Sequence, residues 1–90
     1  MKTLKIHFSG IVQGIFFRSF IKENAEKLKI KGYVRNLSSG ELELIIEGRD
    51  EKINDMLKIC EKGPAHSEIK KIEIKEIKHQ GFSEFKILSL

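Results

Sequence analysis

The sequence is short of the residues that form disulfides and membrane spans. It contains one cysteine, one proline and no tryptophan in 90 residues. A single cysteine cannot close an internal disulfide, and the N-terminus lacks the basic, apolar and small-residue regions of a secretion signal. Apolar residues occur only in short runs, whereas a membrane helix needs roughly 20. We therefore expect a cytoplasmic protein with no disulfide and no membrane partner.

Positive charge is in moderate excess. Lys and Arg number 17 against 13 Asp and Glu, which gives a net charge of +4. Such an excess suits nucleic acid, a small anionic ligand or mere solubility, and does not choose among them. The hydrophobic share of 40% is spread evenly, as in a folded chain. Because 90 residues supply one modest core, we expect a single domain over residues 1–90 and a monomer.

The first third of the sequence has two clear periodicities. Residues 3–9 alternate between apolar and polar side chains, which predicts a half-buried strand. Apolar residues then recur every three or four positions from Phe17 to Leu28, which predicts one face of a helix that ends near Lys29. Residues 10–16 are then the loop between strand and helix.

A hairpin and a second helix follow. Residues 33–37 and 41–44 flank the turn sequence Ser38-Ser39-Gly40, which indicates two paired strands. Asp50 is a suitable N-cap for a helix with apolar residues at helical spacing, and Gly63-Pro64 ends it.

The last part of the chain predicts two further strands. Residues 69–77 predict a long strand with an irregularity near Lys70 and Lys71, and Gly81 turns the chain into a final strand over residues 82–88. The order is βαββαβ with the last strand unit split. We therefore expect an α+β, ferredoxin-like fold: an antiparallel sheet of four to five strands with two helices on one face.

One segment has the composition of an anion-binding loop. Gly10-Ile-Val-Gln-Gly-Ile-Phe-Phe-Arg18 joins the first strand to the first helix, and its glycines allow backbone amides to surround an anion. The helix N-terminus and Arg18 would add positive charge. Taken alone, such a segment is more often a tight turn followed by a solvated arginine, because glycine loops before helices are common. It matches neither the Walker nor the dinucleotide-binding pattern.

Chain geometry brings a second residue to this loop. A right-handed βαβ crossover returns the second strand parallel to the first. A helix of about a dozen residues descends roughly 18 Å, and a strand regains about 3.3 Å per residue. We therefore expect Asn36, at the end of the second strand, to approach the loop.

These two segments carry a resemblance to a known family. Residues 10–18 and Gly32-Tyr-Val-Arg-Asn36 resemble the two signature segments of the acylphosphatase family, in the right order and separation. Glu47-Gly48 and Gly63-Pro64 also stand where that family usually has them, so the similarity covers nearly the whole chain.

The resemblance implies hydrolysis of a small-molecule acyl phosphate to a carboxylate and inorganic phosphate, with phosphate or sulfate as product or inhibitor. Arg18 would bind the phosphate and Asn36 would orient the attacking water. The backbone amides around the phosphate would come from Ile11, Val12, Gln13, Gly14, Ile15, Phe16 and Phe17.

The chemistry of the residues agrees with these roles. A carboxylate leaves readily at neutral pH, so no general acid is needed, and an asparagine can only hydrogen-bond. Phosphoryl transfer chiefly needs positioning and donors around the equatorial oxygens. His7, His66 and His79 lack ligand-like spacing, so we expect no metal, and we expect no cofactor. Cys60 lies on the apolar stripe of its helix and is expected to be a buried hydrophobe.

The sequence departs from the family at four positions. None removes a proposed catalytic group, although a lost threonine hydroxyl at Ile21 could change turnover. The family commonly has threonine at Ile21, glycine at Lys29, tryptophan at Tyr33 and aspartate at Ser39.

Two other functions remain open. RNA recognition motifs share this order of elements, but they stack bases on aromatic residues, whereas the third strand here carries Glu41, Glu43 and Glu47. We therefore expect no nucleic acid partner. A non-catalytic sensing or carrier domain is less expected in a chain of this length. Nothing recognisable in the sequence identifies the acyl group.

Overall fold

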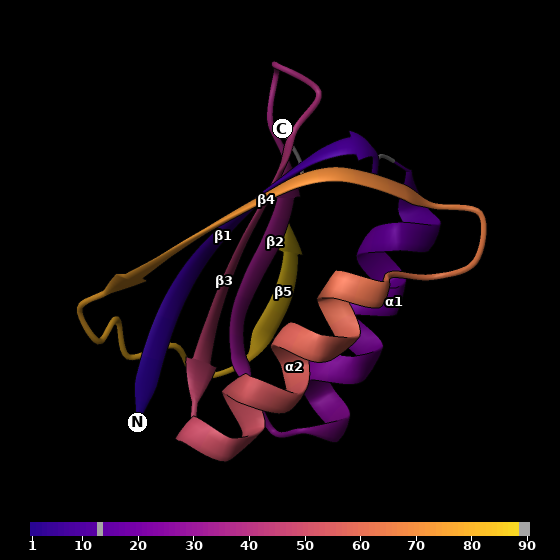
Figure 1. Ribbon diagram of the computed structural model, residues 1–90. Coiled ribbons are helices and arrows are strands. Elements are labelled where there is room, and N and C mark those ends of the chain that lie inside the picture. The colour runs from indigo at the N-terminus through magenta and orange to yellow at the C-terminus, as the bar shows by residue number, and fades with distance from the viewer. Residues whose placement is uncertain (13, 89–90) are drawn as a thin grey trace.

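The computed structural model describes residues 1–12 and 14–88, which form seven helices and strands (Figure 1). In chain order these are β1 (Lys2–Ile11), α1 (Ile15–Lys27), β2 (Lys31–Asn36), β3 (Leu42–Gly48), α2 (Asp50–Lys62), β4 (Glu68–Ile77) and β5 (Phe85–Leu88). Neither helix of the described residues is long and apolar enough to cross a membrane.

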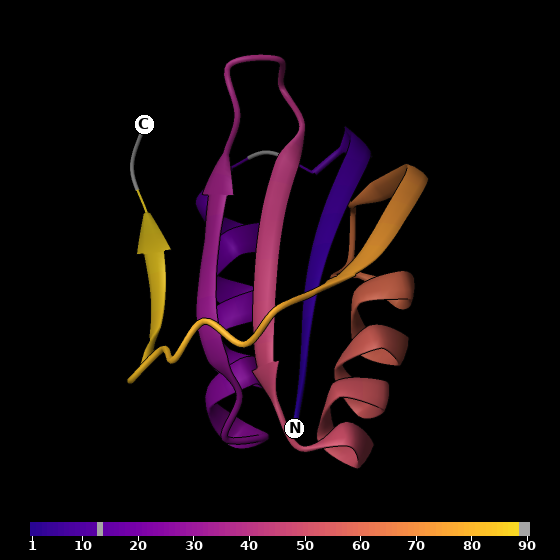
Figure 2. The same ribbon diagram turned by 90° about the vertical axis from the view of Figure 1, so that its left-hand side faces the viewer.

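The strands form one twisted sheet in the order β4-β1-β3-β2-β5. Both helices lie on one face of it, and the other face is open (Figures 1 and 2). The predicted ferredoxin-like α+β fold is confirmed. Its sheet is mixed, however, because β5 pairs parallel to β2 while the other neighbours are antiparallel. The reason is that the chain leaves β4 at one edge, crosses the open face, and enters β5 at the other edge in the direction of β2 (Figure 2).

The core lies between the sheet and the helices. Alternation along β1 and β3 turns one set of side chains toward the helices, as the period-two pattern predicts. This set pairs across the strands, with Ile6 opposite Leu44 and Phe8 opposite Leu42. The helices contribute buried residues at helical spacing, namely Phe17, Ile21, Ala25, Ile53, Met56 and Cys60.

The first strand is longer than the sequence predicts. β1 continues through Ile11, so the loop before α1 contains only residues 12–14. The extra pairing passes a bulge: Ser9 faces Lys71 and Gly10 faces Ile69, which leaves Lys70 as the extra residue. The irregularity predicted near Lys70 is thereby confirmed. At Gly10 a Cβ would collide with the carbonyl oxygen of Glu68, so only glycine fits this close approach.

Helix α1 ends in a Schellman motif. Lys29 has φ 58, the left-handed conformation that the family's glycine predicts at this position. Its N–H donates to the Glu26 carbonyl at 3.1 Å, and the Ile30 N–H donates to the Ala25 carbonyl at 2.8 Å. Both hydrogen bonds satisfy carbonyls at the end of the helix.

The start of α2 differs from the prediction by one residue. Arg49 is the N-cap, and Asp50 lies in the first turn instead. There the carboxylate of Asp50 faces the positive end of the helix dipole and lies 3.5 Å from the amino group of Met1. These interactions explain why an aspartate at this position stabilises the helix without capping it.

A buried glutamate holds the connection between β4 and β5. Glu47 is 2% exposed, and its carboxylate accepts hydrogen bonds from the Thr3 hydroxyl and from the N–H groups of Gln80, Gly81 and Phe82. Burial raises the pKa of Glu47. The hydrogen bonds, of which that from Gln80 has the largest effect, outweigh burial and lower the pKa below its usual value. The carboxylate is therefore a structural anchor for the chain that crosses the open face.

Candidate active site

The loop between β1 and α1 lies at the end of the sheet where β2 also ends (Figure 2). Within it Val12 is buried, and Gly14 is the N-cap of α1 with φ 98, a conformation that favours glycine. Gln13 lies outside the described residues. Of the other expected loop residues, Ile11 belongs to β1, whereas Ile15–Phe17 form the first turn of α1.

The N-terminus of α1 is free of negative charge. No acidic residue stands in its first turn, and Gly14 provides no side-chain cap. The first four N–H groups of a helix have no partner within the helix, and they sit at the positive end of its dipole. The amides of Ile15, Phe16 and Phe17 are therefore available to an anion, without competition from a capping side chain.

Arg18 lies in the same turn. Its Nε is 3.5 Å from the carbonyl oxygen of Gly14, a long and weak hydrogen bond. Among the described residues, no carboxylate lies within ion-pair distance of Arg18. Arg35, the arginine of the second motif, differs: its Nε donates to the carboxylate of Glu43 at 2.8 Å. Arg18 is therefore the motif arginine whose charge remains free for a ligand.

Asn36 comes to the same end of the sheet. It faces Leu42 on β3, and Leu42 faces Phe8 on β1, so the three form one row across the sheet. Alternation from the buried Val34 places Asn36 on the face that carries the helices. The loop that leads into α1 lies at the same end of the sheet (Figure 2). The topology therefore places Asn36 and the start of the helix that carries Arg18 at one end of the sheet, and their meeting in one site stays a prediction.

The side chain of Asn36 has an unusual feature. Its Oδ1 is buried and has no hydrogen-bond partner, and it is the only such side-chain atom among the described residues. A buried acceptor without a partner costs about 1–3 kcal/mol. An unpaired buried acceptor calls for an explanation, and a catalytic role is one.

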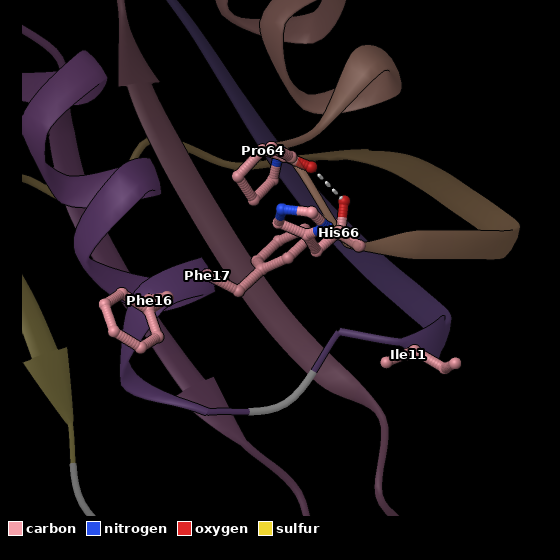
Figure 3. Close-up of a pocket in the computed structure, with 7 residues that line it drawn as sticks. Ile11, Phe16, Phe17, Pro64 and His66 are labelled. Carbon is pink, nitrogen blue, oxygen red and sulfur yellow. Dashed lines mark hydrogen bonds between the residues drawn. The ribbon is translucent and has the colours of Figure 1, made fainter.

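An apolar pocket adjoins the loop (Figure 3). It has a volume of about 480 Å³, and its walls come from the end of β1, the start of α1 and the connection from α2 to β4. The lining residues are Ile11, Phe16, Phe17, Pro64, Ala65, His66 and Ser67. The sequence patterns do not predict this pocket, since Gly63-Pro64 indicates only the end of a helix. The available signal was a cluster of apolar residues at 15 and 16 in a stretch expected to be loop.

The open face of the sheet has a different character. At its centre, the buried carboxylate of Glu43 accepts hydrogen bonds from Tyr33 at 2.9 Å and Arg35 at 2.8 Å, and lies 3.2 Å from His7. Burial raises the pKa of Glu43, but these hydrogen bonds and the charge of Arg35 outweigh it and lower the pKa. The Lys5 ammonium also lies 3.7 Å from this carboxylate, so Glu43 neutralises part of the positive charge of its basic neighbours.

The remaining candidate groups have no place at the site. Among the described residues, no cluster of three His, Cys, Asp or Glu side chains could hold a metal ion. Cys60 is buried as expected, and burial raises the pKa of its thiol to about 12. Such a thiol stays protonated at neutral pH and is not a nucleophile.

The fold and this end of the sheet define a small ferredoxin-like protein whose strand-to-helix loop leads into an uncapped helix N-terminus. The family profile described as acylphosphatase matches residues 4–87. The chain therefore belongs to the acylphosphatase family, and the resemblance seen in its two motifs is confirmed.

Relatives support this assignment over the whole chain. An acylphosphatase of Methanocella arvoryzae is 39% identical over 91% of this chain and 97% of its own. The crystal structure of the acylphosphatase from Bacillus subtilis superposes with a TM-score of 0.93 at 29% identity, covering 98% of this chain and 99% of that one. T. kodakarensis HypF contains a similar unit, with a TM-score of 0.86 and 38% identity. The match covers 100% of this chain and only 12% of the HypF chain. The prediction of an enzyme of this family is confirmed.

Proposed function

We propose that the chain hydrolyses acyl phosphates, with Arg18 and the amides of residues 11–17 binding the phosphate and Asn36 orienting the attacking water. The observation that carries the proposal is the unpaired Oδ1 of Asn36. The same end of the sheet carries an uncapped helix N-terminus and an arginine that pairs with no carboxylate of the described residues. Family membership and the names of the relatives support the reaction class.

The phosphate would bind where the two sources of positive charge meet. The amides at the start of α1 can donate to two phosphate oxygens, and the guanidinium of Arg18 can donate to others in a bidentate fork. These donors point at the equatorial oxygens, where charge spreads in a loose transition state. Binding at this position lowers the barrier without covalent chemistry by the protein.

The attacking water would be held by Asn36 at the end of β2. Rotation of the Asn36 amide about χ2 breaks no protein hydrogen bond of Oδ1, because Oδ1 makes none. Turned toward the loop, Oδ1 accepts one proton of the water, and the water keeps a lone pair directed at phosphorus. No ionisable base is needed, because the carboxylate leaves as an anion and the released proton goes to solvent.

The proposal includes the physical state of the protein. We propose a cytoplasmic monomer with one domain over residues 1–90, no metal, no cofactor and no nucleic acid or membrane partner. The Glu43 carboxylate at the centre of the open face neutralises part of the charge of Lys5 and Arg35, which supports the absence of nucleic acid, since binding a phosphate backbone needs free cations. Inorganic phosphate or sulfate would bind at the loop as product or inhibitor.

Two alanine variants test the division of labour. Arg18→Ala should abolish both phosphate binding and turnover, because it removes the motif cation that is free of a protein carboxylate. Asn36→Ala should keep phosphate affinity within a few fold and lose about a hundredfold or more in kcat, a reasonable size for one positioning contact. Arg35→Ala is the matched control for loss of a cation, and it should retain phosphate binding.

The measurements are phosphate titration by NMR and steady-state hydrolysis of acetyl phosphate. If Asn36→Ala loses phosphate binding as fully as Arg18→Ala does, Asn36 is a phosphate ligand and not a water ligand. Substantial turnover by Arg18→Ala would refute the proposed clamp. Circular dichroism of each variant separates these outcomes from unfolding.

A further inference from the structure

The pocket beside the loop has no role in holding the phosphate or the water. Its walls are mostly apolar, and the Ser67 hydroxyl is engaged, since it donates to the Pro64 carbonyl at 2.6 Å (Figure 3). The volume of about 480 Å³ lies in the range of small-molecule pockets. The exposed imidazole of His66 is the other polar side chain in the lining. Apart from it the walls are apolar, so the pocket suits an apolar group.

Exposed apolar side chains gather at the same place. The described residues expose five large hydrophobic side chains, and three of them flank the loop: Ile11 at 62%, Ile15 at 54% and Phe16 at 86%. Exposing a phenylalanine to this degree forgoes most of the free energy that burying its ring gives. Apolar surface clustered at a site is typical of a region that a ligand covers.

The leaving group of the proposed reaction points away from the attacking water, and the pocket adjoins the loop that would hold the phosphate. In an in-line displacement the leaving oxygen stands opposite the attacking water across phosphorus. Asn36, which would hold the water, is on β2, whereas Ile11 and Ser67 belong to the end of β1 and the approach to β4. Strand β3 lies between β2 and β1, so the β1 wall of the pocket is separated from Asn36 by one strand at this end of the sheet.

We propose that this pocket is the acyl subsite and that it selects acyl phosphates with apolar acyl chains. The inference rests on the proposed function, because that reaction fixes the direction of the leaving group. The acyl chain packs between Phe16, Phe17 and Pro64, and its carboxylate leaves across this surface. Chains that end in a charged group gain nothing from it.

The test is a series of acetyl, butanoyl and hexanoyl phosphate, whose leaving carboxylates have nearly the same basicity. A fully buried methylene is worth about fourfold in kcat/KM, so partial burial of the added chain should give hexanoyl phosphate an advantage of at least about tenfold over acetyl phosphate. Adipoyl phosphate, of the same length but ending in a carboxylate, should lose that advantage.

Ala65→Phe fills the pocket from an exposed position, and it should cut the hexanoyl-to-acetyl ratio to less than about threefold. Ser83→Phe places the same ring on the exposed connection before β5, and the ratio should stay as in the wild type. A flat series in the wild type, or an advantage that survives Ala65→Phe, overturns the acyl subsite.

A binding measurement separates this inference from the proposed function. Hexanoylphosphonate has a carbon–phosphorus bond in place of the hydrolysable link, and it should shift the methyl NMR signals of Ile11 and Ala65 more than acetylphosphonate does. If these signals shift but no acyl phosphate is hydrolysed, the subsite stands and the proposed function fails. If hydrolysis proceeds without the shifts, the subsite is refuted alone. Shifts of the same signals on dilution of the free protein would assign the surface to a second copy of the chain and refute the subsite.

Discussion

Replacing Asn36 with leucine should stabilise the protein and inactivate it. Leucine has nearly the shape of asparagine but no polar atom, so the variant removes the buried, unpaired Oδ1. Removing an orphan acceptor gains about 1–2 kcal/mol, and leucine suits a strand better than asparagine does. In a chain of this size that gain corresponds to a rise in Tm of roughly 5–10 °C.

The same variant should lose turnover by at least about a hundredfold, because leucine cannot accept a proton from water. Asn24→Leu is the matched control. The Nδ2 of Asn24 donates to the Phe20 carbonyl at 2.8 Å, on a part of α1 away from the loop. This control should keep turnover within about twofold.

The assays are thermal unfolding followed by circular dichroism and hydrolysis of acetyl phosphate at saturating substrate. A lower Tm for Asn36→Leu would mean that the amide supports the fold, and the argument from an unpaired acceptor would be wrong. Retained turnover in a stabilised variant would refute the role of Asn36 in orienting water.

Three further predictions follow from features of the fold. Lys29→Gly should raise the free energy of unfolding by about 1 kcal/mol in denaturant titrations, because Lys29 has φ 58, whereas Glu23→Gly inside the helix should lower it by about as much. Glu47→Gln should lower it by about 3 kcal/mol at pH 7, since an amide cannot accept all the hydrogen bonds that the carboxylate receives. The pKa of Glu47 is lowered in the folded protein, so the ionised carboxylate stabilises the wild type fully above the carboxyl's ordinary pKa. This stabilisation should be lost as the pH falls through the folded pKa. Glu47→Gln cannot titrate and should not show this loss on acidification. Hydrolysis of acetyl phosphate should proceed at full rate in excess EDTA and be inhibited competitively by phosphate, and a rate that returns only with added divalent ion would contradict the metal-free mechanism.

Local sequence patterns predict where the helices and strands of this fold lie better than they predict which strands pair. The alternation of residues 3–9 and the helical spacing from Phe17 to Leu28 define β1 and α1, because each burial pattern repeats along one element. The parallel pairing of β5 with β2 is not predictable in the same way. Phe85 and Ile87 alternate as a strand should, but the choice of partner depends on where the chain crosses the open face.

The ends of helices and strands are predicted less accurately for a related reason. Gly10 and Ile11 do not continue the alternation of β1, yet they pair with β4 beyond the bulge. Their place in the strand is set by a distant segment and not by local preference. Ile45 likewise interrupts the alternation of β3 because it is 7% exposed on the open face, where the connection to β5 crosses the sheet.

The candidate site is predicted only in part, for the same physical reason. Arg18 and Asn36 each stand in a short continuous motif, so the geometry of one crossover is enough to predict that both motifs lie at the same end of the sheet. The apolar pocket draws its walls from three separate segments, including Ile11, Phe16 and Pro64. No single stretch of sequence carries its pattern, so it emerges only from the assembled chain.

The parallel pairing at the sheet edge has a consequence for the order in which the structure assembles. β5 has four residues and pairs with β2 alone, whereas β4 at the opposite edge has ten residues. The pairing of Gly32 with Phe85 also joins distant parts of the sequence. Closing such a long loop costs entropy, and the pairing offsets this cost only after the central strands have formed. We therefore expect β5 to dock late in folding and to detach first from the native protein. Its amide protons should then exchange with solvent through an opening that leaves β1 and β3 intact and uncovers the edge of the strand that ends in Asn36.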